Sequence, residues 1–194
     1  MNSHEPPSHA LLASDPQPNR RTVLWVAGAA AALSGAGAAW WRSSRVPVAS
    51  ELSGEPAPEG FWKAQWPTPA GTQLSMAGML GRPLLLNFWA TWCPPCVEEL
   101  PLLNAFYRQH HANGWQVVGL AVDKLQPVQQ FLQKSPLDFP VGMAGIAGTE
   151  LGRSLGNLAG GLPFTVVFGA DGSILHRKMG RVTAQELALW AGLK

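Results

Sequence analysis

Two cysteines carry the chemistry that this sequence most clearly suggests. Cys93 and Cys96 are the only two cysteines among the 194 residues, and two prolines, Pro94 and Pro95, separate them. Thiols three positions apart can form a disulfide with each other or exchange one with a partner. Two cysteines are too few for a scaffold stapled by several disulfides and for a four-cysteine zinc site. The pair therefore predicts thiol–disulfide chemistry, with no cofactor and no metal.

The sequence around the pair predicts a strand before it and a helix after it. Residues 83–89 are a continuous apolar run of strand length, and apolar residues recur at helical spacing over 97–111. Cys93 would then lie exposed at a helix N-terminus, where free backbone N–H groups and the helix dipole favour a thiolate. Cys96, one turn later and partly buried, would resolve a mixed disulfide formed at Cys93. Prolines are tolerated there, because the first helical residues need no N–H.

Strands and helices alternate along the rest of the chain. Thr183 with Glu186 three residues later is a helix-capping signature, and an Asp-Gly turn at 170–172 favours a hairpin. The other expected elements are strands at 116–122, 139–142, 164–168 and 174–179, and helices at 127–134, 146–155 and 183–190. This order predicts an α/β fold in which a central mixed sheet lies between helices.

The N-terminal part is typical of a targeting or anchoring arm. Residues 1–21 are polar and predict a disordered cytoplasmic tail, and residues 42–60 predict a linker before a domain at 61–194. The stretch 22–41 carries no charge and predicts a hydrophobic helix. At about 1.5 Å per residue it just spans the roughly 30 Å hydrocarbon core of a membrane.

The arm can be a retained anchor or a cleaved signal. We favour the anchor, which makes the protein a single-pass protein of the inner (cytoplasmic) membrane with its catalytic domain in the periplasm. The alternative is a soluble periplasmic protein, since Arg20-Arg21 resembles a twin-arginine export signal and small residues at 36–38 suit signal cleavage. From residue 50 onward ten basic residues balance ten acidic ones. We therefore expect a domain that binds no nucleic acid. We also expect the protein to be a monomer.

The segment 87–101, Asn-Phe-Trp-Ala-Thr-Trp-Cys-Pro-Pro-Cys-Val-Glu-Glu-Leu-Pro, resembles the active-site segment of the thioredoxin superfamily. More narrowly, it is similar to that of the TlpA/ResA-like membrane-anchored or exported thiol–disulfide oxidoreductases. The likeness extends from about residue 61 to residue 194. It implies a thioredoxin fold with a helix–strand insertion at 127–142, and a redox-active disulfide between Cys93 and Cys96.

The resemblance also implies roles for residues that support the cysteines. Leu162-Pro163 matches the cis-proline segment of the family, which sits against the cysteines and offers backbone to a docking partner. The alternative is an ordinary trans-proline that opens a strand. Trp92 would shield the thiol, or would simply pack in the core.

Glu99 matches a family glutamate just after the cysteines, and a carboxylate held near Cys96 can take its proton as a general base. The alternative is an exposed glutamate that only complements the helix dipole, which we expect of its neighbour Glu98. Thioredoxin itself usually carries a buried aspartate where this chain has Asn87. That departure strengthens the case for Glu99.

The resemblance favours a reductase of protein disulfides outside the cytoplasm. Its partners would be a disulfide-containing client protein and a thiol electron donor in the membrane, because an oxidising compartment offers no reductant in solution. Maturation of respiratory proteins or cytochromes is one such role. Cytochrome-maturation members commonly place an acidic residue directly after the cis-proline, and Phe164 stands there instead.

Three other classes of function stay open. The main alternative is a copper-handling module for oxidase assembly, in which the two cysteines and a distant histidine such as His176 hold the metal. A second is a non-catalytic interaction module, and a third is a peroxide reductase.

Overall fold

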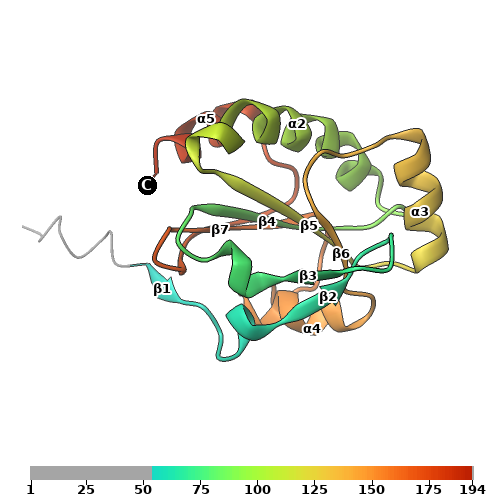
Figure 1. Ribbon diagram of the computed structural model, residues 1–194, viewed down its shortest axis with the longest axis horizontal. Coiled ribbons are helices and arrows are strands. Elements are labelled where there is room, and N and C mark those ends of the chain that lie inside the picture. The colour runs from blue at the N-terminus through green and yellow to red at the C-terminus, as the bar shows by residue number, and fades with distance from the viewer. Residues whose placement is uncertain (1–53, 194) are drawn as a thin grey trace, which may run out of the picture. The chain divides into compact units, whose positions relative to one another are not determined.

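The structure, a computed structural model, describes residues 54–193. The strands are β1 (Glu55–Pro56), β2 (Gln65–Pro67), β3 (Gln73–Ser75), β4 (Leu84–Trp89), β5 (Gln116–Ala121), β6 (Val141–Met143), β7 (Phe164–Phe168) and β8 (Ser173–Met179). The helices are α2 (Pro94–His110), α3 (Leu125–Lys134), α4 (Ala147–Ser154) and α5 (Ala184–Ala191), with 3-10 helices η1 (Phe61–Lys63), η2 (Met76–Met79) and η3 (His111–Asn113). Figure 1 shows this arrangement.

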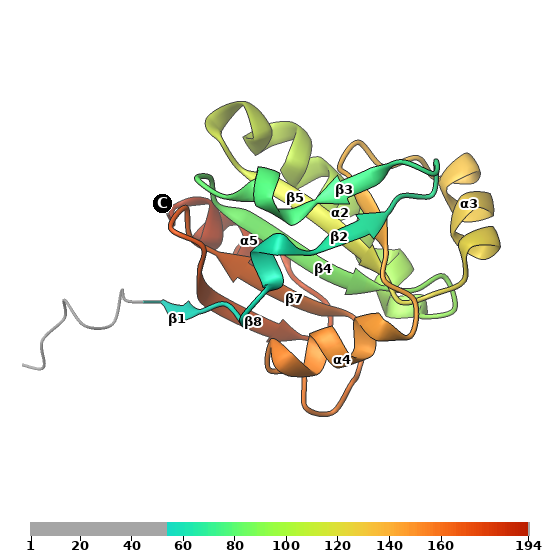
Figure 2. The same ribbon diagram turned by 60° about the horizontal axis from the view of Figure 1, so that its bottom comes forward.

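A six-stranded mixed sheet in the order β1-β8-β7-β4-β5-β6 forms the centre of the domain, and β2 and β3 form a separate hairpin. β4 runs parallel to β5 and antiparallel to β7. Helices α2 and α5 cover one face of the sheet, and α4 lies on the other face with the β2–β3 hairpin (Figures 1 and 2). This is the helix–sheet–helix arrangement that the order of elements predicted.

The residues of β4 alternate between the two faces. Leu85 and Trp89 belong to the core beneath α2 and α5, whereas Leu84, Leu86 and Phe88 belong to the core on the opposite face. Both cores exclude water, so the whole strand is apolar except for Asn87, which is buried too. A strand covered on both faces explains the continuous apolar run in the sequence.

The expected elements beyond residue 83 are all present, with boundaries that differ by a few residues. The helix expected at 127–134 begins earlier, at Leu125, and together with β6 it forms the helix–strand insertion. The capping box of the last helix is confirmed, because Thr183 and Glu186 exchange hydrogen bonds of 2.9 and 3.2 Å between side chain and backbone.

The region before residue 83 holds structure that the sequence did not predict. The β2–β3 hairpin and the 3-10 helices η1 and η2 lie there. Strand β1 falls within the stretch 42–60, which was expected to be a linker, and it pairs with β8. The proposed tail and hydrophobic helix lie outside the described residues. Between residues 54 and 193 no helix combines the length and the apolar character needed to cross a membrane.

Candidate active site

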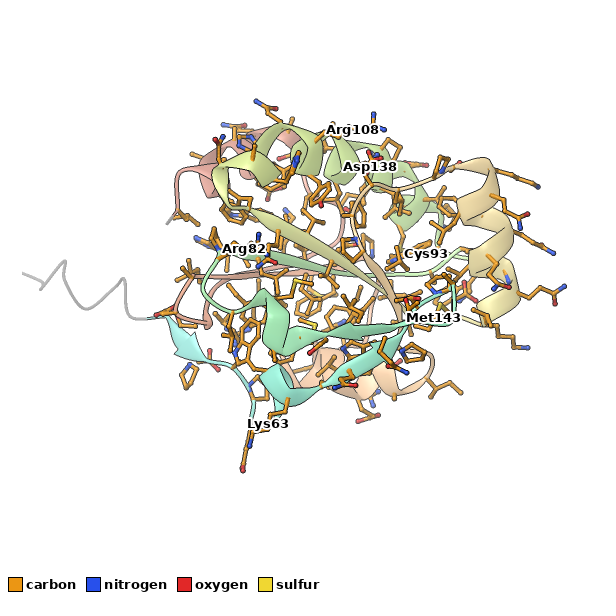
Figure 3. The ribbon with its side chains drawn as sticks, in the orientation of Figure 1. Lys63, Arg82, Cys93, Arg108, Asp138 and Met143 are labelled. Atoms are coloured by element: carbon orange, nitrogen blue, oxygen red, sulfur yellow. A yellow bond between two sulfur atoms is a disulfide. The ribbon has the colours of Figure 1, made fainter. Side chains whose placement is uncertain are left out.

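The two cysteines lie at the junction of β4 and α2. Cys93 is the N-cap residue of α2, and the backbone N–H groups of Cys96 and Val97 donate to its carbonyl oxygen over 3.0 and 3.2 Å. Cys93 and Cys96 are joined by a disulfide, with their Cα atoms 5.3 Å apart. Cys93 lies toward the same end of the domain as Met143 (Figure 3), which fits the alignment of the ends of β4, β5 and β6.

Cys93 and Cys96 differ in their exposure to solvent, although the difference is smaller than expected. Cys93 is 5% exposed and Cys96 is fully buried. The sequence predicted an exposed Cys93 and a partly buried Cys96, and both are covered further because they pack into the core beneath α2. Only Cys93 offers an incoming thiol any surface to attack.

The start of α2 also has fewer free donors than predicted. Pro94 and Pro95 occupy its first two positions and have no N–H, and the N–H of Cys96 already donates to the carbonyl oxygen of Cys93. The expectation of free backbone N–H groups around the sulfur of Cys93 is therefore wrong. The helix dipole is the contribution of α2 that would still favour a thiolate there.

Replacing Pro95 by alanine tests this electrostatic picture. An N-cap side chain accepts from the second or third helical N–H, so Pro95→Ala supplies a donor at the second position. Hydrogen bonds to charged groups contribute roughly 1.5–3 kcal/mol, so we expect the pKa of the reduced Cys93 to fall by about one unit. Thiolate absorbance followed against pH measures it. Pro94→Ala is the matched control and should change little, and an unchanged pKa in Pro95→Ala would contradict the picture.

Glu99 is a buried residue, 1% exposed, three positions after Cys96 on the same face of α2. Its Oε2 accepts from the N–H of Val182 and its Oε1 accepts from Nδ2 of Asn87, each over 2.8 Å. Burial raises the pKa of Glu99, and these hydrogen bonds and the charge of Arg181 offset part of the rise. The alternative of an exposed glutamate at position 99 is excluded.

Glu98, by contrast, is exposed as expected, and its Oε2 accepts a hydrogen bond from Nη1 of Arg181 over 2.6 Å. That ion pair joins the first turns of α2 to the connection between β8 and α5. The same connection supplies the Val182 N–H to Glu99.

The peptide bond between Leu162 and Pro163 is cis, as the resemblance implies, so the trans-proline alternative is excluded. Pro163 lies just before β7, whose first residue, Phe164, pairs with Phe88 near the end of β4. Leu162 packs against the core that contains both cysteines. The register therefore brings the cis-proline segment to the same edge of the sheet as Cys93.

A hydrogen-bonded brace holds the loop before the cysteines. Asp123 Oδ2 accepts from the N–H and from the hydroxyl of Thr91, over 2.8 and 2.6 Å. Asp123 follows β5 and Thr91 follows β4, so the brace ties the ends of two neighbouring parallel strands. Sequence reasoning missed it, although polar residues directly after two buried strands were a usable signal.

Trp92 is 65% exposed, so it does not pack in the core. This residue, which directly precedes Cys93, lines a hollow of about 600 Å³ together with Lys124 and Ile146, and Ile146 is 90% exposed. Exposed apolar side chains of this size beside a reactive group are typical of a binding surface.

His176, the third copper ligand of the main alternative, stacks on Trp190 with ring centroids 6.2 Å apart. Within residues 54–193, no three His, Cys, Asp or Glu side chains gather in a way that could hold a metal ion.

Comparison with known proteins shows which family this chain belongs to. The Redoxin family model matches residues 52–188. The thiol-disulfide oxidoreductase ResA of Bacillus cereus is 29% identical over 119 residues, which cover 60% of this chain and 66% of that protein. The chain thus spans slightly less than two thirds of the length of this relative.

Solved structures agree with the fold. A thiol:disulfide interchange protein of the thioredoxin family from Chlorobium tepidum is 27% identical to this chain, with a TM-score of 0.60. The matched region covers 72% of this chain and 97% of that chain. StoA from Bacillus subtilis is also 27% identical, with a TM-score of 0.54, and covers 66% of this chain and 94% of its own.

Proposed function

Because this chain belongs to the Redoxin family, we propose that it is a thiol–disulfide oxidoreductase that reduces protein disulfides outside the cytoplasm. The observation that carries the proposal is the Cys93–Cys96 disulfide at the start of α2, at the same sheet edge as cis-Pro163 and one helical turn before the buried Glu99. The similarity to proteins named thiol-disulfide oxidoreductases supports the same activity.

The reduced protein begins the reaction with a thiolate at Cys93. This thiolate attacks one sulfur of a client disulfide, so that a Cys93–client S–S bond forms, the client S–S bond breaks, and the other client sulfur leaves as a thiolate. Glu99 then takes the proton of Cys96. The Cys96 thiolate attacks Sγ of Cys93 and displaces the second client sulfur. The client gains two electrons, and the protein ends with the Cys93–Cys96 disulfide.

Client docking is assigned to the surface around Cys93. Trp92 and Ile146 offer apolar contact area, and the backbone at Leu162 lies beside the cis-proline. Carbonyl and N–H groups in such a segment can pair with an extended client chain, as strand addition does in other peptide-binding proteins. Trp92 in this role covers the mixed disulfide rather than the resting thiol.

The proposed setting is the outer side of the inner membrane, with residues 22–41 as an anchor or export signal. The chain enters the domain at β1, which pairs with Ser173 and Ile174 at the far end of β8 from Met179. Met179 pairs with Phe164 beside the cis-proline, so the cysteines lie at the end of the sheet opposite to the point of entry.

The reduction potential tests the direction of the reaction. We expect a value closer to the roughly −270 mV of thioredoxin than to the roughly −120 mV of the strong oxidant DsbA. Equilibration of the protein with dithiol buffers of known potential, followed by mass analysis of the alkylated forms, gives this value. A potential near that of DsbA would favour net oxidation and reject the reductase.

A further inference from the structure

A chain of buried hydrogen bonds links the proposed base to the centre of the sheet. Nδ2 of Asn87 donates to Oε1 of Glu99 over 2.8 Å and to Oγ1 of Thr165 over 3.0 Å. The N–H of Val182 donates to Oε2 of the same carboxyl group over 2.8 Å. Asn87 and Thr165 are fully buried and Glu99 nearly so. These hydrogen bonds therefore join α2 to β4, to β7 and to the connection between β8 and α5.

Asn87 is the only polar residue of β4, and it points toward α2, between Leu85 and Trp89. A buried amide costs free energy unless its groups are hydrogen-bonded. Its Nδ2 serves two acceptors, whereas Oδ1 is buried and accepts no hydrogen bond from the described residues. The amide of Asn87 thus donates to the carboxylate of Glu99, and its oxygen is left without a hydrogen bond from the described residues.

We propose that Asn87 is a positioning residue whose hydrogen bond holds the carboxylate of Glu99 in the orientation in which it takes the proton of Cys96. This inference rests on the proposed function. The buried amide of Asn87 is then the hydrogen-bond partner of the general base, Glu99.

Two properties of the amide make it suited to this role. As a donor it stabilises the carboxylate, whose charge burial disfavours, and Thr165 holds the amide in place. After Glu99 has taken the proton of Cys96, its O–H needs an acceptor. Rotation of the Asn87 amide by half a turn presents Oδ1 to that O–H, and the Thr165 hydroxyl can then donate to the same oxygen. Asn87 can therefore pair with Glu99 in both protonation states.

The charged groups around Glu99 do not replace this function. Arg181 favours the carboxylate, but it is engaged with Glu98 on the surface. On β8, Lys178 is paired with Glu186 of α5. Asn87 and the Val182 N–H are the two hydrogen-bond donors that the described residues offer to the carboxylate of Glu99.

Titration of Glu99 in oxidised Asn87 variants tests the proposal, because disulfide-bonded cysteines do not ionise and the measurement needs no client. Carbon NMR of the side-chain carboxyl follows the midpoint. Asn87→Leu should raise the proton affinity of Glu99 about tenfold, since the donor is lost. Asn87→Asp places a second carboxyl group within hydrogen-bond distance and should give two coupled steps instead of one. Gln116→Glu, a buried amide-to-acid change at the start of β5, where Gln116 pairs with Leu84 of β4, is the control and should leave Glu99 unchanged.

The rate of the second step gives an independent readout. In Asn87→Leu, release of a client thiol from Cys93 should be about tenfold slower at pH values below the midpoints of Glu99 in both proteins, and should approach the wild-type rate above the raised midpoint of the variant. A purely structural role would slow the reaction equally at all pH values.

The outcomes separate the two proposals. Glu99 midpoints that are unchanged in folded Asn87→Leu and Asn87→Asp overturn the role of Asn87, and if the leucine variant does not fold, the single step or double step of the aspartate variant decides. Midpoints that move as expected in a protein that reduces no disulfide would uphold Asn87 and reject the proposed function.

Discussion

Cys93→Ser is expected to abolish disulfide reduction, with a loss on the order of a thousandfold or more. The serine hydroxyl stays protonated at neutral pH and forms no bond with a client sulfur, so the first exchange step has no nucleophile. Cys96 cannot substitute for it, because it is fully buried. Turnover of a protein disulfide such as that of insulin measures the loss, and an unchanged circular dichroism spectrum shows that the fold is intact.

The matched variant, Cys96→Ala, should stop the same reaction one step later. The Cys93 thiolate still attacks, but no second thiol displaces the client, so the mixed disulfide accumulates. Mass analysis of the adducts would identify the client and also the electron donor. Retained turnover in Cys93→Ser, or equal trapping on Cys96 in that variant, would contradict the assignment of the two sulfurs.

The sequence predicted most of the fold because apolar periodicity reports burial directly. The run at 83–89 reflects a strand that lies between two cores, and the helical spacing over 97–111 reflects a helix that packs against one core; both elements lie where they were expected. The N-terminal hairpin was not predicted, since its strands β2 and β3 have only three residues each and carry little pattern.

The site could be predicted only where its residues are close in sequence. Cys93, Cys96 and Glu99 fall within two turns of one helix, so their spacing fixes their relation. Asn87 and Thr165 are 78 positions apart and meet only through the register of β4 and β7. No local pattern reports such a register. The partners of Glu99 therefore required the structure.

The burial of Glu99 changes the meaning of its charge. A carboxylate on the helix surface would only complement the dipole, whereas one held in the interior one helical turn after Cys96 fits the proposed base, whose strength its neighbours would set. Because its pKa is raised, the folded protein loses stability as the pH rises from the ordinary value of 4.5 through the raised value. The proposed proton transfer would account for an unfavourable charge in the interior.

Glu99→Gln should therefore separate the two steps of the reaction. The first attack by Cys93 needs no base and should keep its rate, whereas release of the client should slow by about a hundredfold at neutral pH. The glutamine fits the same space, since the Asn87 amide can turn its free oxygen toward the new N–H group. Rapid-quench measurement of mixed-disulfide formation and decay gives both rates, and Glu98→Gln, the exposed neighbour, should leave both unchanged.

The pH dependence of the release rate in this variant gives the sharpest test, because loss of a base changes that dependence, whereas a damaged fold does not. In the wild type, the release rate should rise with pH through the raised pKa of Glu99, since only the carboxylate accepts a proton. In Glu99→Gln that rise should vanish, and the rate should increase only where the Cys96 thiol ionises by itself, at or above the roughly 8.5 of a free cysteine, because burial disfavours its thiolate. A variant that is slowed by the same factor at every pH would show that Glu99 supports the structure and moves no proton.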